Sequence, residues 1–295
     1  MINEARESLA ALSFPQRQRL QYIESMALWE GAVARQRVCD LFGVSLNHIT
    51  KDLRLYRELL PHNLDYDPSL RIWRPSARFR PAICSGSPEE YLGLLRLGLE
   101  AAGVAGIPTL EGPIAADAIP APRWPADAKP LRHVTRAVRE GTGVRVRYQS
   151  MSTPEPDERI LWPHALVYAG FRWHARAYDE KHKQFGDFVL PRICEATPHA
   201  GDAPVSAKRD EGWNTRERAE VIPNPRLSKA QQAAIAREYG MSKTAQGWCW
   251  SVSMRQCLVR YFLHWHRLDK PAAKDRVIAR NLEELKRWAF ADADD

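Results

Sequence analysis

The feature that most limits the fold of this chain is a run of prolines near its middle. Residues 103–130 contain six prolines among many glycine and alanine residues. Proline lacks the backbone N–H that helices and central strands require, so this segment predicts a linker or a long irregular connection. The chain of 295 residues therefore divides into an N-terminal and a C-terminal part, and its length suits two or three domains.

Composition narrows the class of protein. Lys and Arg number 43 against 36 Asp and Glu, and the net charge of +7 fits a polyanionic partner without proving one. The five cysteines are scattered and form no CxxC pair, which argues against a disulfide framework or structural zinc and favours the reducing cytoplasm. The acidic N-terminus is not a signal peptide, and no stretch approaches the roughly 18 apolar residues of a membrane helix. We expect a cytoplasmic protein without cofactor, metal or membrane partner.

The first 80 residues predict three helices followed by a hairpin. A helix is expected over residues 16–29, and a second over residues 35–42 that ends at Gly43. Ser45 caps a third helix, whose apolar stripe consists of Leu46, Ile49, Leu53, Tyr56 and Leu60. Alternating residues around a turn at 67–69 predict the hairpin. This order is typical of a winged helix-turn-helix domain, which we place at residues 1–80.

The opposite face of the third helix predicts contact with DNA. Asn47, His48 and Lys51 lie near its N-terminus, where a recognition helix reads base edges, whereas Arg54 and Arg57 suit phosphates. The full set of predicted DNA contacts is Ser45, Asn47, His48, Thr50, Lys51, Arg54, Arg57, Arg71 and Arg74. The alternative is an ordinary solvated helix face, and the presence of Asp52 and Glu58 on the same helix favours it slightly.

After residue 80 the pattern of apolar and polar residues changes. We expect a helical and Pro-rich linker over residues 81–130, with a helix at 87–100. Residues 131–200 predict a helix and then short alternating strands, one of them over residues 187–193, which suggests a small barrel. Residues 201–295 mix helices with a strand, and the last helix is expected over residues 281–290. Ser228 with Gln231 forms a capping-box pattern.

One of the predicted strands carries a cationic face. Alternation along residues 171–178 places Arg172, His174, Arg176 and Tyr178 on the same side, and Arg192 lies in the next strand candidate. Guanidinium groups present paired donors that match a phosphate or carboxylate. On the strand pattern alone, a solvent-exposed polar face is the better interpretation.

Four segments in this region resemble the WYL domain of bacterial transcription regulators. They are residues 148–151 (YQSM), 163–166 (PHAL), 170–179 (GFRWHARAYD) and 185–193 (FGDFVLPRI). The resemblance implies an Sm-like β-barrel that binds nucleic acid or nucleotide ligands. The Trp-Tyr-Leu triplet of that family is replaced by Trp173-His174-Ala175, and His in second place is similar to the BrxR and CapW regulators found beside phage-defence operons.

That subgroup implies an α+β multidomain protein with a winged helix, a WYL domain and a C-terminal α/β dimerisation domain. It further implies a homodimeric repressor of a phage-defence operon, bound to an inverted-repeat duplex and controlled by an anionic nucleotide or oligonucleotide. The family's ligand positions fall on Tyr148, Ser150, His164, Arg172, His174, Arg176 and Arg192, and Tyr148 is expected to stack on a base.

Two other classes of function stay open: a nucleic-acid-processing enzyme and an RNA-binding protein, each with a DNA-binding head. The chain has no P-loop, no GxGxxG and no HExxH motif, and no acid–base pair stands out. We therefore expect that the protein is not an enzyme.

Overall fold

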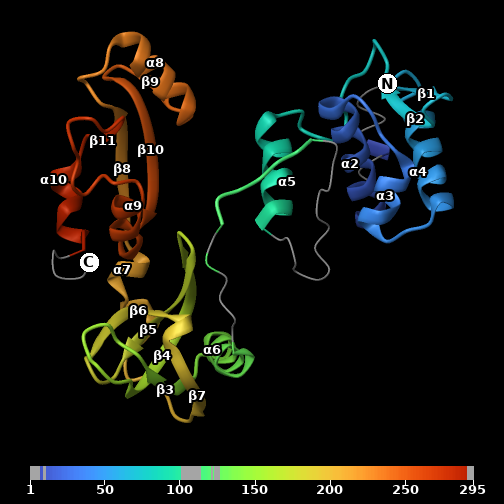
Figure 1. Ribbon diagram of the computed structural model, residues 1–295. Helices are drawn as coiled ribbons and strands as arrows, with labels where there is room; N and C mark the ends of the chain where they lie inside the picture. The colour runs from blue at the N-terminus through green and yellow to red at the C-terminus, as the bar shows by residue number, and fades with distance from the viewer. Residues whose placement is uncertain (1–6, 9–10, 101–113, 121, 123–126, 291–295) are drawn as a thin grey trace. The chain divides into compact units, whose positions relative to one another are not determined.

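The computed structural model describes residues 7–8, 11–100, 114–120, 122 and 127–290 (Figure 1). The chain forms two units, residues 1–120 and 121–295. Residues 101–113, in the middle of the expected linker, lie outside the described part. No helix in the described ranges is both long and apolar enough to cross a bilayer.

The first unit contains the predicted helices and hairpin. Figure 1 shows three helices beside an antiparallel pair of strands: α2 (Phe14–Glu30), α3 (Arg35–Phe42), α4 (Leu46–Leu59), β1 (Leu64–Asp67) and β2 (Ile72–Pro75). Gly43 adopts a left-handed φ of 61° directly after α3, a conformation that glycine tolerates best. The Ser45 side chain accepts a hydrogen bond from the His48 N–H and caps α4. The predicted winged helix-turn-helix is confirmed.

The core of this unit lies between α2 and α4. Leu20 and Ile23 of α2 and Ile49 and Tyr56 of α4 are fully buried. Leu46 departs from the predicted stripe and is 48 % exposed, because it lies in the first turn of α4, beyond the helices that cover the later turns.

The first unit extends beyond residue 80. Helix α5 (Pro88–Glu100) contributes the buried Tyr91 to the same core, where its ring stacks on Trp29 with centroids 5.7 Å apart. The fully buried Glu24 accepts hydrogen bonds from the N–H groups of Ile83 and Cys84 at 2.6 and 2.8 Å. These contacts place residues 82–95 with the winged helix and not in the linker that we expected from residue 81.

The second unit begins with a helix and a five-stranded antiparallel sheet of order β6-β5-β4-β3-β7. Its elements are α6 (Ala128–Glu140), β3 (Gly143–Tyr148), β4 (Asp157–Ala169), β5 (Arg172–Asp179), β6 (Gln184–Val189), the 3-10 turn η1 (Leu190–Arg192) and β7 (Ile193–His199). Within residues 143–199, all of which are described, β6 and β7 each pair with a single neighbour, so the sheet is open. The closed Sm-like barrel that we expected is not observed.

The strand predicted over residues 187–193 is interrupted. Strand β6 ends at Val189, and a 3-10 turn containing Pro191 follows, because proline cannot donate the next ladder hydrogen bond. Strands β4 and β7 on either side of β3 were not predicted.

The C-terminal part of this unit is a four-stranded sheet of order β11-β8-β10-β9 with helices on it. Its elements are η2 (Ala207–Arg209), α7 (Glu211–Asn214), β8 (Arg216–Pro223), α8 (Lys229–Glu238), β9 (Ser242–Thr244), β10 (Gly247–Arg255), η3 (Gln256–Leu258), α9 (Val259–Trp265), β11 (Val277–Ala279), α10 (Leu282–Leu285) and η4 (Lys286–Trp288). Val259, Leu263 and Leu268 form the centre of its core. The capping box at Ser228 and Gln231 is confirmed, whereas the last predicted helix, residues 281–290, is only a short turn of helix.

Candidate nucleic-acid interface and ligand site

Helix α4 turns one face to solvent, and its first two turns carry the predicted base-reading residues. Asn47, His48 and Lys51 are all exposed there. Asp52 lies on the inner side instead, where Arg19 Nε donates to its carboxylate at 2.6 Å and the Asp52 side chain is 2 % exposed. This ion pair holds α4 against α2. Asp52 therefore does not lie on the exposed face, and only Glu58 still supports the interpretation of that face as an ordinary solvated one.

The N-terminus of α3 joins the same surface. Arg35 Nη1 donates to Thr50 Oγ1 at 3.2 Å, and Thr50 in turn donates to the Leu46 carbonyl at 2.8 Å. Arg35 was missed in the sequence because it precedes the turn and belongs to a different helix from the predicted contacts. Its guanidinium adds a positive charge beside Thr50.

The hairpin meets α4 through a cation–π contact. The guanidinium of Arg57 lies 4.9 Å from the centroid of the Trp73 ring in β2. Arg54 pairs with the exposed Glu58 at 2.9 Å, and Arg74 pairs with Asp67 at 3.2 Å. Exposed surface pairs of this kind contribute little stability and exchange easily for phosphates.

Two of the predicted cations have no such partner. Among the residues that the structure describes, no ion pair involves Lys51 or Arg71, and Arg71 projects from the hairpin turn with a left-handed φ of 56°. Taken together, α4 and the hairpin present an exposed cationic surface.

In the second unit, the predicted face of β5 is covered and not solvated. Arg176 is 5 % exposed and is held by two carboxylates. Its Nε and Nη2 donate to the two oxygens of Asp210, both at 2.8 Å, and its Nη1 donates to Asp187 at 3.1 Å. The positive charge of Arg176 is therefore neutralised within the chain.

The same cluster joins the five-stranded sheet to the C-terminal sheet. His164 Nε2 on β4 donates to Asp210 at 2.9 Å, and Tyr261 on α9 donates to Asp187 at 3.1 Å. Burial raises the pKa of Asp210, but the hydrogen bonds from His164 and Arg176 outweigh it and hold that pKa well below its usual range. Asp187, Asp210 and Tyr261 had not been predicted as site residues.

The other end of the face carries buried polar atoms without a hydrogen-bond partner. His174 is 2 % exposed, and its Nδ1 and the Nε of Arg172 are buried without a hydrogen-bond partner. Burial lowers the pKa of His174, and the charges of Arg172 and Arg192 lower it further against the opposing charge of Asp187. Arg172 and Arg192 take part in no ion pair within the described ranges.

Two predicted ligand residues lie elsewhere. Tyr148 is 6 % exposed in the sheet core, its hydroxyl accepts a hydrogen bond from the Val189 N–H, and Phe188 packs edge-on against its ring. A base cannot stack on a ring in this position, so the role that we expected for Tyr148 is wrong for this structure. Ser150 lies in the loop after β3, where its hydroxyl pairs with Ser152 at 2.8 Å.

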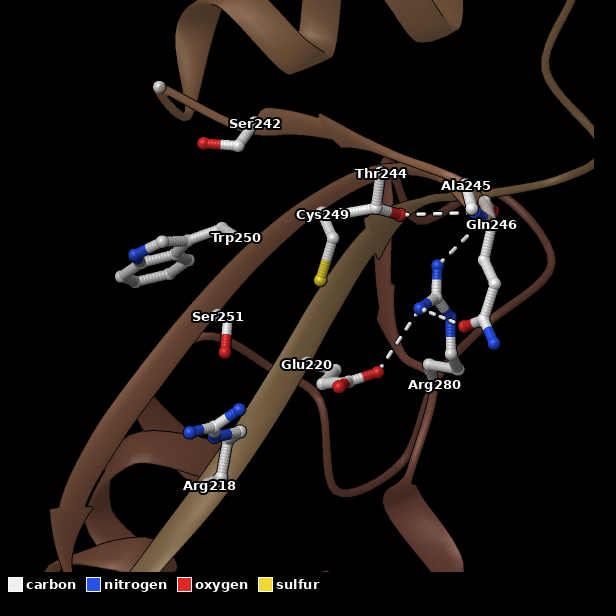
Figure 2. A pocket seen from close by; sticks show the side chains of 11 residues that line it. Arg218, Glu220, Ser242, Thr244, Ala245, Gln246, Cys249, Trp250, Ser251 and Arg280 are labelled. Carbon is white, nitrogen blue, oxygen red and sulfur yellow. Dashed lines mark hydrogen bonds and ion pairs between the residues drawn. The ribbon is translucent and has the colours of Figure 1, made fainter.

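A separate pocket, with a volume of about 580 Å³, lies on the C-terminal sheet (Figure 2). Arg280 Nη1 donates to Glu220 at 3.1 Å and to the Gln246 Oε1 at 2.8 Å. Arg218 and Ser251 line the same pocket (Figure 2). None of these residues was predicted as a site residue.

The fold and these sites define a class: winged helix-turn-helix transcription regulators with a WYL domain and a C-terminal dimerisation domain. The chain matches the BrxR transcriptional regulator winged helix-turn-helix domain over residues 15–97. It matches the WYL domain over residues 130–198 and the BrxR C-terminal dimerization domain over residues 217–285.

Full-length relatives agree with these matches. The DNA-binding transcriptional repressor CapW of Stenotrophomonas maltophilia is 31 % identical over 95 % of this chain and 94 % of its own length. CapW of Escherichia coli (strain KTE188) is 36 % identical over 84 % of this chain and 81 % of its own. The chain belongs to this family of BrxR and CapW transcription regulators. A solved structure, the proteasome accessory factor B/C (PafBC) of Arthrobacter aurescens, is 19 % identical and covers 92 % of this chain and 47 % of that one, with a TM-score of 0.28.

Proposed function

We propose that this protein is a homodimeric transcriptional repressor that reads an inverted-repeat operator with α4. The observation that carries the proposal is the division of α4 between a fully buried side, with Ile49 and Tyr56, and an exposed side with Asn47, His48 and Lys51. The relatives are named as DNA-binding repressors, which supports a regulator over an enzyme. No specific observation favours a nuclease or an RNA-binding protein.

The contacts fall into two groups. Asn47, His48 and Lys51 read base edges in the major groove, since they occupy the N-terminal turns of the helix. The groups that meet phosphates are Ser45, Thr50, Arg54, Arg57, Arg71 and Arg74, to which the structure adds Arg35.

Charge reversal at Lys51 tests this proposal. Lys51→Glu should abolish specific duplex binding, because it replaces a donor to a base edge by a carboxylate, which the negative charge of the duplex repels. Exposed Lys183 on the β5–β6 turn offers a matched control, and Lys183→Glu should bind as wild type does. Arg54→Ala, which removes a proposed phosphate contact, should lower the salt slope of binding by about one unit. Equal affinity of wild type and Lys51→Glu in gel shifts would refute the assignment.

We further propose that an anionic ligand, a nucleotide or short nucleic acid, binds at the β5 face and changes operator affinity. Arg172 and Arg192 supply the unpaired charges of this site, with the buried His174 between them and the covered end formed by His164 and Arg176. Ser150, in the loop after β3, is included as a proposed contact. Couplings between two sites are typically about 1–3 kcal/mol, so a change of roughly 5- to 150-fold is expected. Arg172→Ala with Arg192→Ala should leave operator affinity intact without ligand and remove the response to it.

We propose that the operon under control is a phage-defence operon that includes the regulator's own gene. The resemblance to the BrxR and CapW subgroup supports this. Deleting the gene should raise transcription of its own operon, and the purified protein should bind the DNA upstream of it. Unchanged transcript levels in the deletion strain would contradict the proposal.

A further inference from the structure

Asp210 presents its carboxylate to the β5 face in the way that a ligand phosphate would. Both of its oxygens accept hydrogen bonds from Arg176 at 2.8 Å, and one also accepts from His164 at 2.9 Å. The Asp210 side chain is 1 % exposed. A guanidinium fork holding a two-oxygen anion, with an imidazole beside it, is the arrangement that also recognises a phosphate.

Asp210 does not belong to the sheet that it contacts. It lies between β7 and β8 and caps α7, where its side chain accepts from the Trp213 N–H. The next residue but one, Gly212, approaches Arg176 so closely that a Cβ added there would lie 2.9 Å from Nη2. The ring of Trp213 then packs against His164 with centroids 5.6 Å apart. This segment is therefore a plug of residues 210–213 inserted against the cationic face.

Beyond the plug, the face contains buried polar atoms without a hydrogen-bond partner, and the Tyr261 ring lies 5.2 Å from the ring of His174 there. The Nε of Arg172 and the Nδ1 of His174 are buried and unpartnered, on the same strand face as Arg176. A buried polar group without a partner costs free energy, so the Nε–H of Arg172 favours an incoming acceptor, and His174 Nδ1 does so in the tautomer that carries a proton there. Since Arg172, His174 and Arg176 alternate along one strand, an anion that enters at Arg172 lies in line with the position of Asp210.

We infer that Asp210 is an internal anion that occupies Arg176 in the unliganded protein, and that a phosphate-bearing ligand binds by taking its place. The inference rests on the proposed function, whose ligand face it shares. The ligand pairs with Arg172 and His174 and then replaces the carboxylate at Arg176, which releases the plug of residues 210–213. Because the plug leads directly into β8, this exchange weakens the attachment of the C-terminal sheet to the five-stranded sheet, which the Tyr261–Asp187 hydrogen bond still joins.

The ligand can reach Arg176 only in those molecules in which the plug is released. Its apparent affinity is therefore its intrinsic affinity multiplied by the fraction of such molecules. Asp210→Asn should therefore bind the ligand more tightly than wild type, because the amide no longer neutralises Arg176. Asparagine keeps the cap of α7, so the local backbone is preserved. Asp202, exposed in the same connection, offers a matched control, since Asp202→Asn changes the net charge equally.

The experiment measures the binding of a fluorescein-labelled, 5′-phosphorylated single-stranded tetranucleotide to full-length protein by anisotropy. Asp210→Asn should bind about tenfold or more tightly than wild type, a gain of the size expected for a charged hydrogen bond, whereas Asp202→Asn should not differ. Gly212→Ala is a second variant, because its Cβ pushes Arg176 away from Asp210 without changing any charge. Gly212→Ala should also raise the affinity for the tetranucleotide, and it tests the inference independently of whether Asp210→Asn folds.

Amide hydrogen exchange supplies a readout that binding alone does not. Residues 211–214 should lose protection in wild type when the tetranucleotide is bound, and in Asp210→Asn without it. Unchanged affinity in both Asp210→Asn and Gly212→Ala would overturn the inference. The proposed function fails separately, if no phosphate-bearing ligand alters the operator affinity of wild type.

Discussion

Two acidic residues on α4 show how burial decides the role of a charge. Asp52 and Glu58 look alike in the sequence, but Asp52 is paired with Arg19 in the interior and Glu58 is 57 % exposed beside Arg54. Asp52→Ala leaves a buried guanidinium without its partner and should cost about 3–5 kcal/mol of stability. Glu58→Ala should change stability by about 0.5 kcal/mol or less. Hydrogen exchange of the α4 amides measures both, and equal losses would show that Asp52 is not a structural residue.

His174 makes the stability of the second unit depend on pH. Burial disfavours its imidazolium form and lowers its pKa, with Arg172 and Arg192 adding to the effect and Asp187 opposing it. Below its ordinary pKa of about 6.5, the unfolded chain therefore binds more protons than the folded one, and stability decreases as the pH falls. Its full contribution is present above that pKa.

His174→Gln should flatten this dependence. The variant should lose less unfolding free energy than wild type between about pH 8 and about pH 5 in urea titrations. His266, whose pKa burial also lowers, accounts for part of the remaining slope. Parallel curves for the two proteins would show that the pKa of His174 is the same in the folded and the unfolded chain.

At the scale of elements, the glycine after α3 sets the turn between the two helices of the DNA-reading motif. Gly43 has a φ of 61° and no atom within 4 Å of an added Cβ, so Gly43→Ala introduces strain without a clash and should cost roughly 1 kcal/mol. Gly93 also has open space, but it lies inside α5, and Gly93→Ala should stabilise the protein by about 0.5–1 kcal/mol. Thermal unfolding of the two variants should shift in opposite directions.

Elements whose ends are set by residues next to them in the sequence could be predicted. Elements that depend on partners far away in the sequence could not. Helix α3 has the predicted bounds, because Gly43 and Ser45 terminate and cap the neighbouring helices by their own chemistry. Strand β4 was missed, since Pro163 interrupts it and it buries residues of both parities against its neighbours. The alternation of β5 correctly placed Arg172 and Arg176 on one face.

What covers that face depends on tertiary structure. Asp210 lies 34 residues from Arg176 in the sequence, and no spacing rule joins them. The same holds for Arg19 and Asp52, which are 33 residues apart. The sequence thus indicates which side chains form a cationic face, while the folded chain decides which of their charges are already neutralised.

At the scale of the whole molecule, the cluster of Arg176, Asp187 and Asp210 links the proposed ligand face, through Tyr261, to the part of the chain that matches a dimerization domain. Under the proposal, a change at Asp210 alters how the C-terminal sheet is held, and in the proposed dimer this changes the separation of the two recognition helices. Regulation of this kind would change how well the two recognition helices of the dimer match a pair of half-sites, while the structure of each α4 stays the same. The spacing of the half-sites is then the property that best reports the whole assembly.

A homodimer that reads an inverted repeat should be sensitive to the phase of the two half-sites. Inserting about five base pairs between them turns one half-site to the opposite side of the duplex, and affinity should fall by at least about tenfold, to that of a single half-site. Inserting about ten base pairs restores the phase but not the distance, so recovery should be partial. Gel shifts at one fixed salt concentration measure all three operators, with a half-site duplex as the control. Affinity that is indifferent to spacing would mean that each winged helix binds alone. Light scattering of the complex with the half-site duplex would then show one protomer, where a dimer shows two.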